Sequence, residues 1–413
     1  MSSSPRPAER AARIPPLAPF RSRDFTLLWL GSFVSQAGSQ MHVVAVSWQV
    51  YQLTGDPLAL GGIGVARLVP LLLLALGSGV LADAFDRRKL MLVSQVAMLL
   101  CALALAVASA LGVVTIWWIY IITALSSAAG TLGLPARQAI VPSLVPREQL
   151  QSALSLNLIS FQTATIVGPS LGGLVIAWLG VGWVYSIDAL SFLAVIVALL
   201  LMRVGAVVGE RRPATLGAAL EGLAFVRRTP LIWSTMMLDF LATLFGSATV
   251  LLPLFATDIL EVGSAGLGLL YAAPSVGAVA ASTILSLKGG MRRQGAVLLW
   301  AVGLYGLCTA VFGFSTSFWL SLLMLAGVGA SDTVSMVVRQ TVRQINTPDA
   351  MRGRMTATGM LFFAGGPQLG EIEAGVAARL LGGPLSVAVG GVACVITVGV
   401  LAALTPQLRA YDQ

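Results

Sequence analysis

Long apolar stretches recur along the whole chain, and they constrain its fold more than any other feature of the sequence. A helix that crosses the hydrocarbon core of a bilayer takes about 20 mostly apolar residues. The sequence predicts twelve such spans, at residues 25–51, 58–82, 89–111, 114–138, 149–178, 183–203, 231–257, 265–287, 294–314, 317–340, 351–380 and 384–404. The pattern predicts an all-α, multi-pass membrane protein.

Composition excludes a water-soluble globular fold. Charged residues make up 10% of the 413 residues and hydrophobic residues 57%, whereas a soluble domain carries about 25% charged residues. A chain with so few charges cannot cover a water-facing surface, so its main partner is expected to be the lipid bilayer. The net charge of +8 is attributed to membrane topology, and no nucleic-acid partner is expected.

The basic residues predict the orientation. All 25 Lys and Arg residues except Arg67 and Arg379 fall on one side of the predicted topology. This count places Arg137 and Arg339 in the connections that follow spans 4 and 10. Because cytoplasmic loops are enriched in Lys and Arg, both termini are expected in the cytoplasm, with the protein in the inner membrane.

The chain contains an internal repeat. Arg137-Gln138 corresponds to Arg339-Gln340, and the offset is 202 residues (339 − 137). The same offset pairs Gly168 with Gly370 and Gly173 with Gly375. We therefore expect two parallel six-helix halves. The predicted organisation is a basic cytoplasmic tail at 1–24 without a signal peptide, an N-terminal half at 25–205, a cytoplasmic linker at 206–230 and a C-terminal half at 231–413.

Several motifs resemble the major facilitator superfamily. The segment "GVLADAFDRRK" at 79–89 resembles its loop signature, in which a Gly and an Asp precede a basic cluster, and "ATIVGPSLGG" at 164–173 resembles the span-5 motif of its antiporters. The segments "GLGLLYAAPSVGA", "NTPDAMRGRM" and "QLGEIEAG" resemble the enterobactin-exporter branch, and the resemblance covers essentially all the spans. It implies the major facilitator fold and the efflux of siderophores or drug-like amphiphiles.

The resemblance also implies gating residues. Asp83 would face the N-terminus of span 11 and, with Arg87 and Arg88 beside it, hold the cytoplasmic side shut. A plain positive-inside turn is the alternative. Gly168 and Pro169 would set a close approach and a bend that limit leakage, or serve packing alone. The loop motif departs from the usual pattern at Ala84 and Asp86, and the span-5 motif departs from it at Ala164.

Ionisable residues inside the predicted spans are few, and each needs a partner or water because a charge in the bilayer is costly. They are His42, Arg67, Asp188, Asp239, Asp332, Glu371 and Glu373. Asp239, Asp332 and Glu371 are the candidates for proton coupling. For Asp188 the favoured role is at a helix N-terminus, and for His42 a structural hydrogen bond. Glu371 and Glu373 cannot both face one cavity, because they lie about 200° apart on a helix.

Arg67 and Glu371 lie at similar depths, about 13 Å from the outer ends of spans 2 and 11. An ion pair between them, or between Arg67 and Glu373, would form a gate on the outer side. The alternative is that Arg67 faces the cavity and binds an anionic substrate.

Polar residues on the predicted spans suggest a substrate cavity, and the candidates are Gln36, Gln40, His42, Arg67, Asn157, Gln162 and Asp239. The main hypothesis is a monomeric secondary active exporter of small amphiphilic molecules, driven by proton antiport through alternating access. The alternatives are uptake, gradient-independent transport of a solute or lipid, and a transporter-fold sensor or scaffold. No nucleotide-binding loop or catalytic set is visible, so neither an enzyme nor a cofactor or metal is expected.

Overall fold

The computed structural model describes residues 15–412, apart from 85, 204–223, 289–292, 349–350 and 410. The side chains of 75–84, 352–354, 356–358 and 360–364 also lie outside the described part. The predicted gating residue Asp83 belongs to this set, and most of the predicted linker lies outside the described residues as well. The other predicted site residues are all described.

The described chain is almost entirely helical. Its long helices are α2 (Arg23–Thr54), α3 (Pro57–Ala84), α4 (Arg87–Ala110), α5 (Ile116–Ile140), α6 (Leu150–Leu179), α7 (Val181–Leu201), α9 (Pro230–Phe245), α11 (Gly263–Lys288), α12 (Gln294–Phe314), α13 (Phe318–Asn346), α14 (Arg352–Leu381) and α15 (Gly383–Leu404). Ten segments of the described chain are long and apolar enough to cross a membrane, which makes this a multi-pass membrane protein. α2 and α14 are not among the ten, so the exact number of spans stays a prediction.

Local signals in the sequence set several helix ends. The side chain of Ser22 accepts a hydrogen bond from the Phe25 N–H at the start of α2, and the side chain of Thr115 does the same for Trp118 in α5. Such caps satisfy donors that a helix start leaves without a partner. α2 ends at Gly55, which adopts a left-handed conformation (φ 59°) that glycine accepts at no steric cost.

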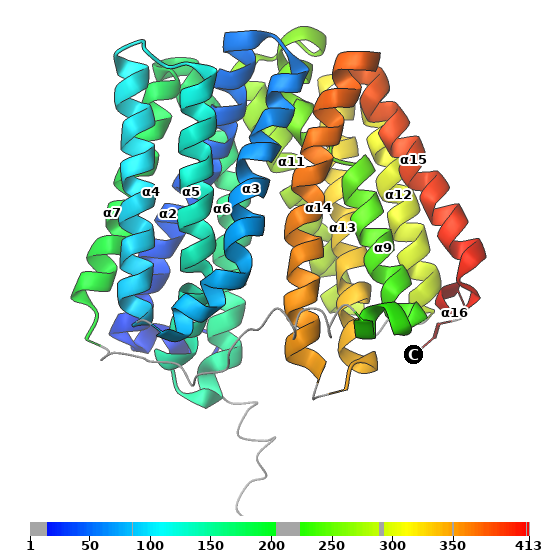
Figure 1. The fold of residues 1–413 in the computed structure, drawn as a ribbon, viewed down its shortest axis with the longest axis horizontal. Helices are drawn as coiled ribbons and strands as arrows, with labels where there is room; N and C mark the ends of the chain where they lie inside the picture. Colours follow the sequence, from blue (N-terminus) through cyan, green and yellow to red (C-terminus); the bar gives the residue numbers. More distant parts are fainter. Residues whose placement is uncertain are drawn as a thin grey trace, which may run out of the picture.

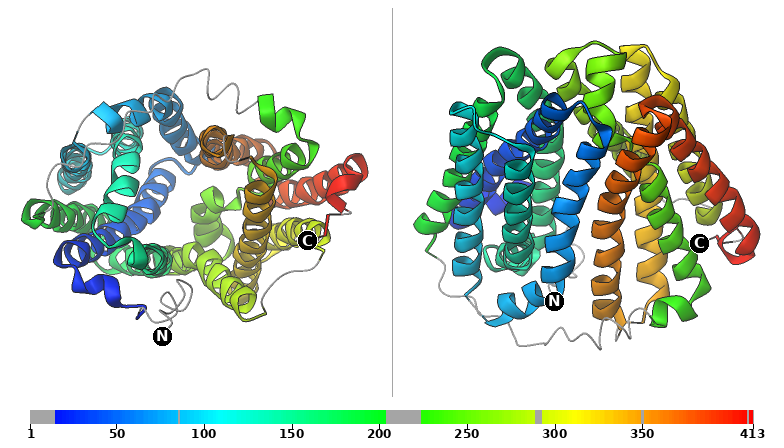
Figure 2. Two further views of the ribbon diagram at one scale, coloured as in Figure 1. Left: turned by 90° about the horizontal axis from the view of Figure 1, so that it is seen from below. Right: turned by 45° about the horizontal axis from the view of Figure 1, so that its top comes forward.

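The helices pack in two groups (Figure 1). In the first group, α2 packs on α6 and α7, α5 packs on α3 and α4, and α4 packs on α7. In the second, α12 packs on α13 and α15, α11 packs on α13, and α14 packs on α9. The main contacts between the groups are α3 with α14 and α6 with α11. Figure 2 shows the two groups side by side when the bundle is seen from below.

Glycines bring the two groups together. A Cβ added to Gly375 on α14 would lie 2.7 Å from the Cα of Gly61 on α3. A Cβ added to Gly173 on α6 would lie 2.9 Å from the Cα of Gly268 on α11. Gly173 and Gly375 are related by the repeat, so both junctions use the same position. Small residues of this kind let helix backbones approach closely in membranes.

Several polar contacts between the groups lie toward one end of the part of the bundle that the structure describes. We call the end near residues 15–23 and 405–412 the termini face and the opposite end the far face, which is uppermost in Figure 1. At the far face Tyr51 donates to Asp258, Tyr271 Oη lies 3.0 Å from Ser47 Oγ, and Arg379 pairs with Asp56. Together with the glycine junctions, these contacts join the two groups at the far face.

The seventh predicted span is interrupted. The sequence predicts one continuous helix over 231–257, but α9 ends at Phe245 and Ser247 is not helical. A 3-10 turn (Ala248–Leu251), one α turn (Leu252–Leu254) and a π turn (Phe255–Ile259) follow. At the break Gly246 leaves room for Tyr305, because a Cβ there would overlap the ring of that tyrosine. The apolar run alone does not reveal this interruption.

Candidate functional site

One cavity lies within the first group of helices. Its volume is about 560 Å³, which falls within the range of small-molecule sites. Its polar lining residues are Ser32, Ser35, Gln36, Ser39, Gln40, Ser94, Gln95, Arg137, Gln138 and Asn157. Larger apolar side chains complete the wall: Leu28, Met98, Leu134, Val141, Leu154, Phe161 and Phe192. The wall combines amides, hydroxyls and apolar groups, as an amphiphilic ligand requires.

The structure brings together part of the predicted cavity set. Gln36 and Gln40 on α2 and Asn157 on α6 line the cavity. The other predicted residues, His42, Arg67, Gln162 and Asp239, are not among the residues that line it. Their role in transport stays a prediction.

Arg137 lies elsewhere than the basic-residue count places it. It belongs to α5 and lines the cavity, whereas the count puts it in the connection after span 4. Among the described side chains, none forms an ion pair or hydrogen bond with its guanidinium. A count of basic residues cannot separate a loop arginine from one a single turn inside a helix.

A second cluster of charges lies in the other group. Arg339 on α13 places Nη1 2.7 Å from Asp239 Oδ1 on α9 and Nη2 3.4 Å from Asp332 Oδ1. It also donates to Ser335 Oγ at 2.9 Å. The sequence places Arg339 in the connection after span 10, but α13 continues to Asn346 and the side chain is 6% exposed. Asp239 is equally buried, whereas Asp332 is 48% exposed.

Arg67 and Glu371 form the predicted contact. Arg67 Nη1 on α3 lies 3.3 Å from Glu371 Oε1 on α14, with side-chain exposures of 25% and 17%. The pair joins the two groups, next to the glycine contact between Gly61 and Gly375. Its action as a gate stays a prediction. Glu373, the other candidate partner, does not form the ion pair with Arg67.

His42 and Asp188 form a buried pair inside the first group. His42 Nδ1 lies 2.9 Å from Asp188 Oδ2, and Asp188 is 3% exposed. The sequence favours a helix N-terminal role for Asp188, and this is wrong: α7 begins at Val181 with no side-chain cap. Asp188 instead lies two turns inside the helix, where its side chain contacts His42. His42 Nδ1 forms no hydrogen bond with a described residue, so the structural hydrogen bond predicted for His42 stays a prediction.

The predicted gating residues on α6 and α4 have defined neighbours. A Cβ added to Gly168 would lie 2.7 Å from the carbonyl oxygen of Ala37 on α2. A Cβ added to Gly268 on α11 would overlap the carbonyl oxygen of Pro169. Arg87 and Arg88 donate to the carbonyls of Ala139 and Leu200, at 3.4 Å and 3.2 Å. Gly168 therefore packs inside its group and Pro169 against the other group, and their gating roles stay predictions.

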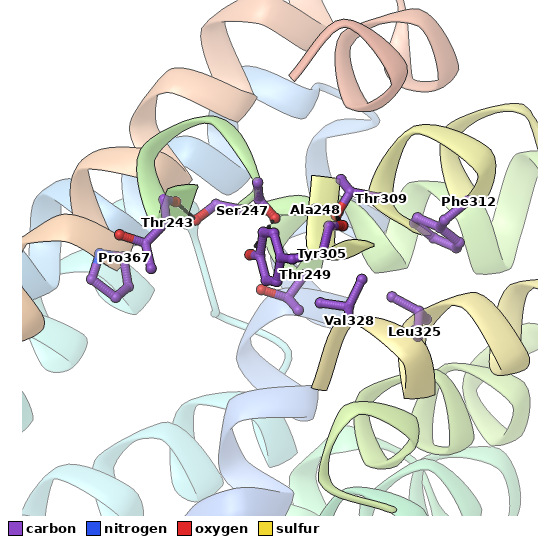
Figure 3. A pocket seen from close by; sticks show the side chains of 11 residues that line it. Thr243, Ser247, Ala248, Thr249, Tyr305, Thr309, Phe312, Leu325, Val328 and Pro367 are labelled. Carbon is purple, nitrogen blue, oxygen red and sulfur yellow. Dashed lines mark hydrogen bonds between the residues drawn. The ribbon is translucent and has the colours of Figure 1, made fainter. Parts of the chain in front are cut away.

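A smaller pocket of about 170 Å³ lies at the break after α9. In Figure 3 the side chains of Ser247, Thr249 and Tyr305 gather at its centre, with Phe312 and Leu325 toward one end. Tyr305 Oη donates to the carbonyl of Gly246 at 3.0 Å. Non-helical backbone at membrane depth requires such partners, because no lipid group can supply them.

Comparison with known proteins agrees with this architecture. A family model described as "transmembrane secretion effector" matches residues 14–413. The chain is 28% identical to the enterobactin exporter EntS of Citrobacter koseri over 394 residues, which cover 94% of this chain and 93% of that one. It is 29% identical to EntS of Escherichia coli O1:K1 / APEC over 336 residues, 80% of this chain and 79% of that one.

Solved structures are similar in fold. A point mutant of the nucleoside transporter NupG has a TM-score of 0.75 and 13% sequence identity, over 92% of this chain and all of that one (100%). A bacterial homologue of the iron transporter ferroportin in the inward-facing state has a TM-score of 0.71 and 17% identity, over 94% of this chain and 99% of that one. These similarities show the fold alone.

Proposed function

The chain belongs to the transmembrane secretion effector family of major facilitator transporters, and on that premise we propose that it exports small amphiphilic molecules through alternating access driven by proton antiport. It is a membrane transporter and not an enzyme. The relatives named enterobactin exporter support an outward direction and a siderophore or drug-like substrate. We place it in the inner membrane as a monomer, with both termini in the cytoplasm.

The observation that carries this proposal is the cavity together with the contacts that join the two groups at the far face. The cavity extends along α2 from Gln40 to Leu28, five residues after α2 begins at the termini face. Cross-group contacts join the two groups at the far face. A transporter that loads substrate from the cytoplasm needs a cavity that reaches this face while the outer face is shut. The amide side chains inside the bundle also argue against a sensor or scaffold, because such a protein does not need polar groups in its interior.

We propose that at least one of Asp239, Asp332 and Glu371 takes up and releases the driving proton. Each faces an arginine at 2.7–3.4 Å, so protonation would weaken an ion pair that holds helices together. Asp332 has the most exposed side chain of the three, so it is the most accessible of them to water. Glu371 pairs with Arg67 across the two groups, so its protonation would release one contact between them.

The test is transport by purified protein in liposomes with an imposed pH gradient. The panel contains catecholate siderophores and cationic drugs, and the variants are Asp239→Asn, Asp332→Asn and Glu371→Gln. We expect gradient-driven movement of at least one compound and loss of gradient dependence in at least one variant. If all three variants keep full gradient dependence, the proton assignment is wrong. Movement against the expected direction, or without a gradient, would favour uptake or facilitated transport.

A further inference from the structure

We propose that Arg137 is the residue through which the cavity recognises an anionic group on the substrate, such as a carboxylate or an ionised phenol. The inference rests on the proposed transport function and specifies the charge of the transported class. It also assigns anion recognition to a different arginine from Arg67, which is already paired with Glu371.

The cavity holds one cation and no compensating acid among the described residues. No Asp or Glu is among its lining residues, and the polar side chains beside Arg137 are neutral amides and hydroxyls. No described side chain pairs with this guanidinium. A charge away from bulk water is costly without a partner, and a guanidinium offers a planar set of donors that matches a carboxylate. An anionic ligand would provide the compensation that the protein does not.

The internal repeat shows which acidic residues of the second group have no counterpart in the first group. Arg339 corresponds to Arg137 through the offset of 202, and the same offset relates Asp332 to position 130 (332 − 202), which is Gly130. In the second group, Arg339 is compensated by Asp332. In the first group the equivalent position has no side chain, and it opens onto the cavity.

The second acid is missing as well. Gly168 packs against the carbonyl of Ala37, and its repeat partner Gly370 packs against the carbonyl of Thr243, so Ala37 corresponds to Thr243. Asp239, four residues before Thr243, therefore corresponds to Phe33. Two arginines at one repeat position thus differ in both counter-charges. The second group compensates its arginine internally, and the first leaves its arginine to a ligand.

Gly130 allows this difference to be reversed. A Cβ added there has no atom within 4 Å, so the cavity accepts a side chain at this position. Gly130 and Arg137 are seven residues apart, which is about two helical turns and the same face. The ion pair between Asp332 and Arg339 shows that this spacing can bring a carboxylate into contact with a guanidinium. Gly130→Asp should neutralise Arg137 without removing it, and Gly130→Ala is the matched control.

The experiment measures binding of two fluorescent probes to purified full-length protein in detergent. Dansyl-phenylalanine carries a carboxylate, and its methyl ester has the same body without the charge. We expect the wild type to bind the acid about tenfold more tightly than the ester, because a charge-assisted hydrogen bond is lost with the carboxylate. Arg137→Gln and Gly130→Asp should abolish this preference, whereas Gly130→Ala should keep it and the ester should bind all four proteins alike.

Several results would overturn the proposal. These are a wild type that binds neither probe or shows no preference, an acid preference that survives Arg137→Gln or Gly130→Asp, and an equal loss of acid and ester in Gly130→Asp. Transport that is lost in Arg137→Gln while the acid preference remains would make Arg137 a gating residue instead. Binding needs no gradient, so this test can be read even if proton-driven export fails.

Discussion

The two groups of helices carry the same arginine in opposite settings. Arg339 is buried between Asp239 and Asp332, whereas Arg137 lines a cavity without a described partner. The difference comes from acids that one half has and the other lacks, since the arginine itself is common to both. A repeat can therefore keep its helix packing while one half becomes charge-compensated and the other open to a ligand. In such a protein, charge balance must be judged in each half separately.

The largest expected effect is on stability when Arg339 is removed. Arg339→Ala leaves the buried Asp239 without its partner, and breaking a buried ion pair in this way costs about 3–5 kcal/mol. Thermal unfolding in detergent should show a strong loss of stability, whereas Arg137→Ala should change stability little. Asp239→Asn combined with Arg339→Gln is the control, because it removes both charges and should recover most of the loss. Equal effects of the two arginine substitutions would contradict the comparison.

The Arg67–Glu371 pair extends the comparison to an arginine that is compensated across the groups. Arg67→Glu and Glu371→Arg should each weaken transport about tenfold or more, because each brings two like charges together inside the bundle. The double swap should restore most of the transport measured in liposomes. A swap no better than the single variants, with selective loss of anionic substrates, would assign Arg67 to substrate binding and weaken the case for Arg137.

The smallest expected effect comes from the glycines that the repeat shares. A Cβ at Gly168 would lie 2.6 Å from the Cβ of Gln40, and one at Gly370 would lie 2.5 Å from the carbonyl oxygen of Thr243. Gly168→Ala and Gly370→Ala should each destabilise the protein by about 1–3 kcal/mol through overpacking, measured by thermal unfolding. Gly303→Ala is the control, since its Cβ meets no atom within 4 Å, and it should stabilise the helix by about 0.5–1 kcal/mol. Similar results at all three positions would show that close packing is not what these glycines provide.

The sequence predicts features that depend on periodicity and depth. Apolar runs locate the long helices within a few residues, because spans must match the bilayer thickness. The contact between Arg67 and Glu371 can be predicted from the sequence. Both residues are charged and lie at equal depth, on helices that the family resemblance places together. The contact follows from two constraints that sequence provides, rise per residue and the cost of an isolated charge.

Other features depend on contacts that sequence does not reveal. The basic-residue count places Arg339 in a connection because this residue lies at the very end of predicted span 10 (317–340), whereas α13 continues six residues further to Asn346 (346 − 340). The polar end of this helix is stabilised by its packing, which an apolar run does not indicate. The sequence does not reveal the contact between Asp188 and His42, because the two residues are 146 positions apart (188 − 42). The repeat offset of 202 is the one available signal that Arg137 and Arg339 should be compared as a pair.

The break at Gly246 and Ser247 has a mechanical consequence. A continuous α-helix transmits force as a stiff rod, because each turn is bonded to the next. Here the backbone bonds stop in the middle of a span, and the short segment beyond them carries Asp258, the partner of Tyr51 at the far face. Ser247 lies outside both helical pieces, so the orientation of α9 does not by itself set the orientation of the segment that carries Asp258. The segment is held instead by its own packing, since Leu251, Leu252 and Phe255 are fully buried in the same core as Tyr51, and this core therefore positions Asp258 for its contact at the far face.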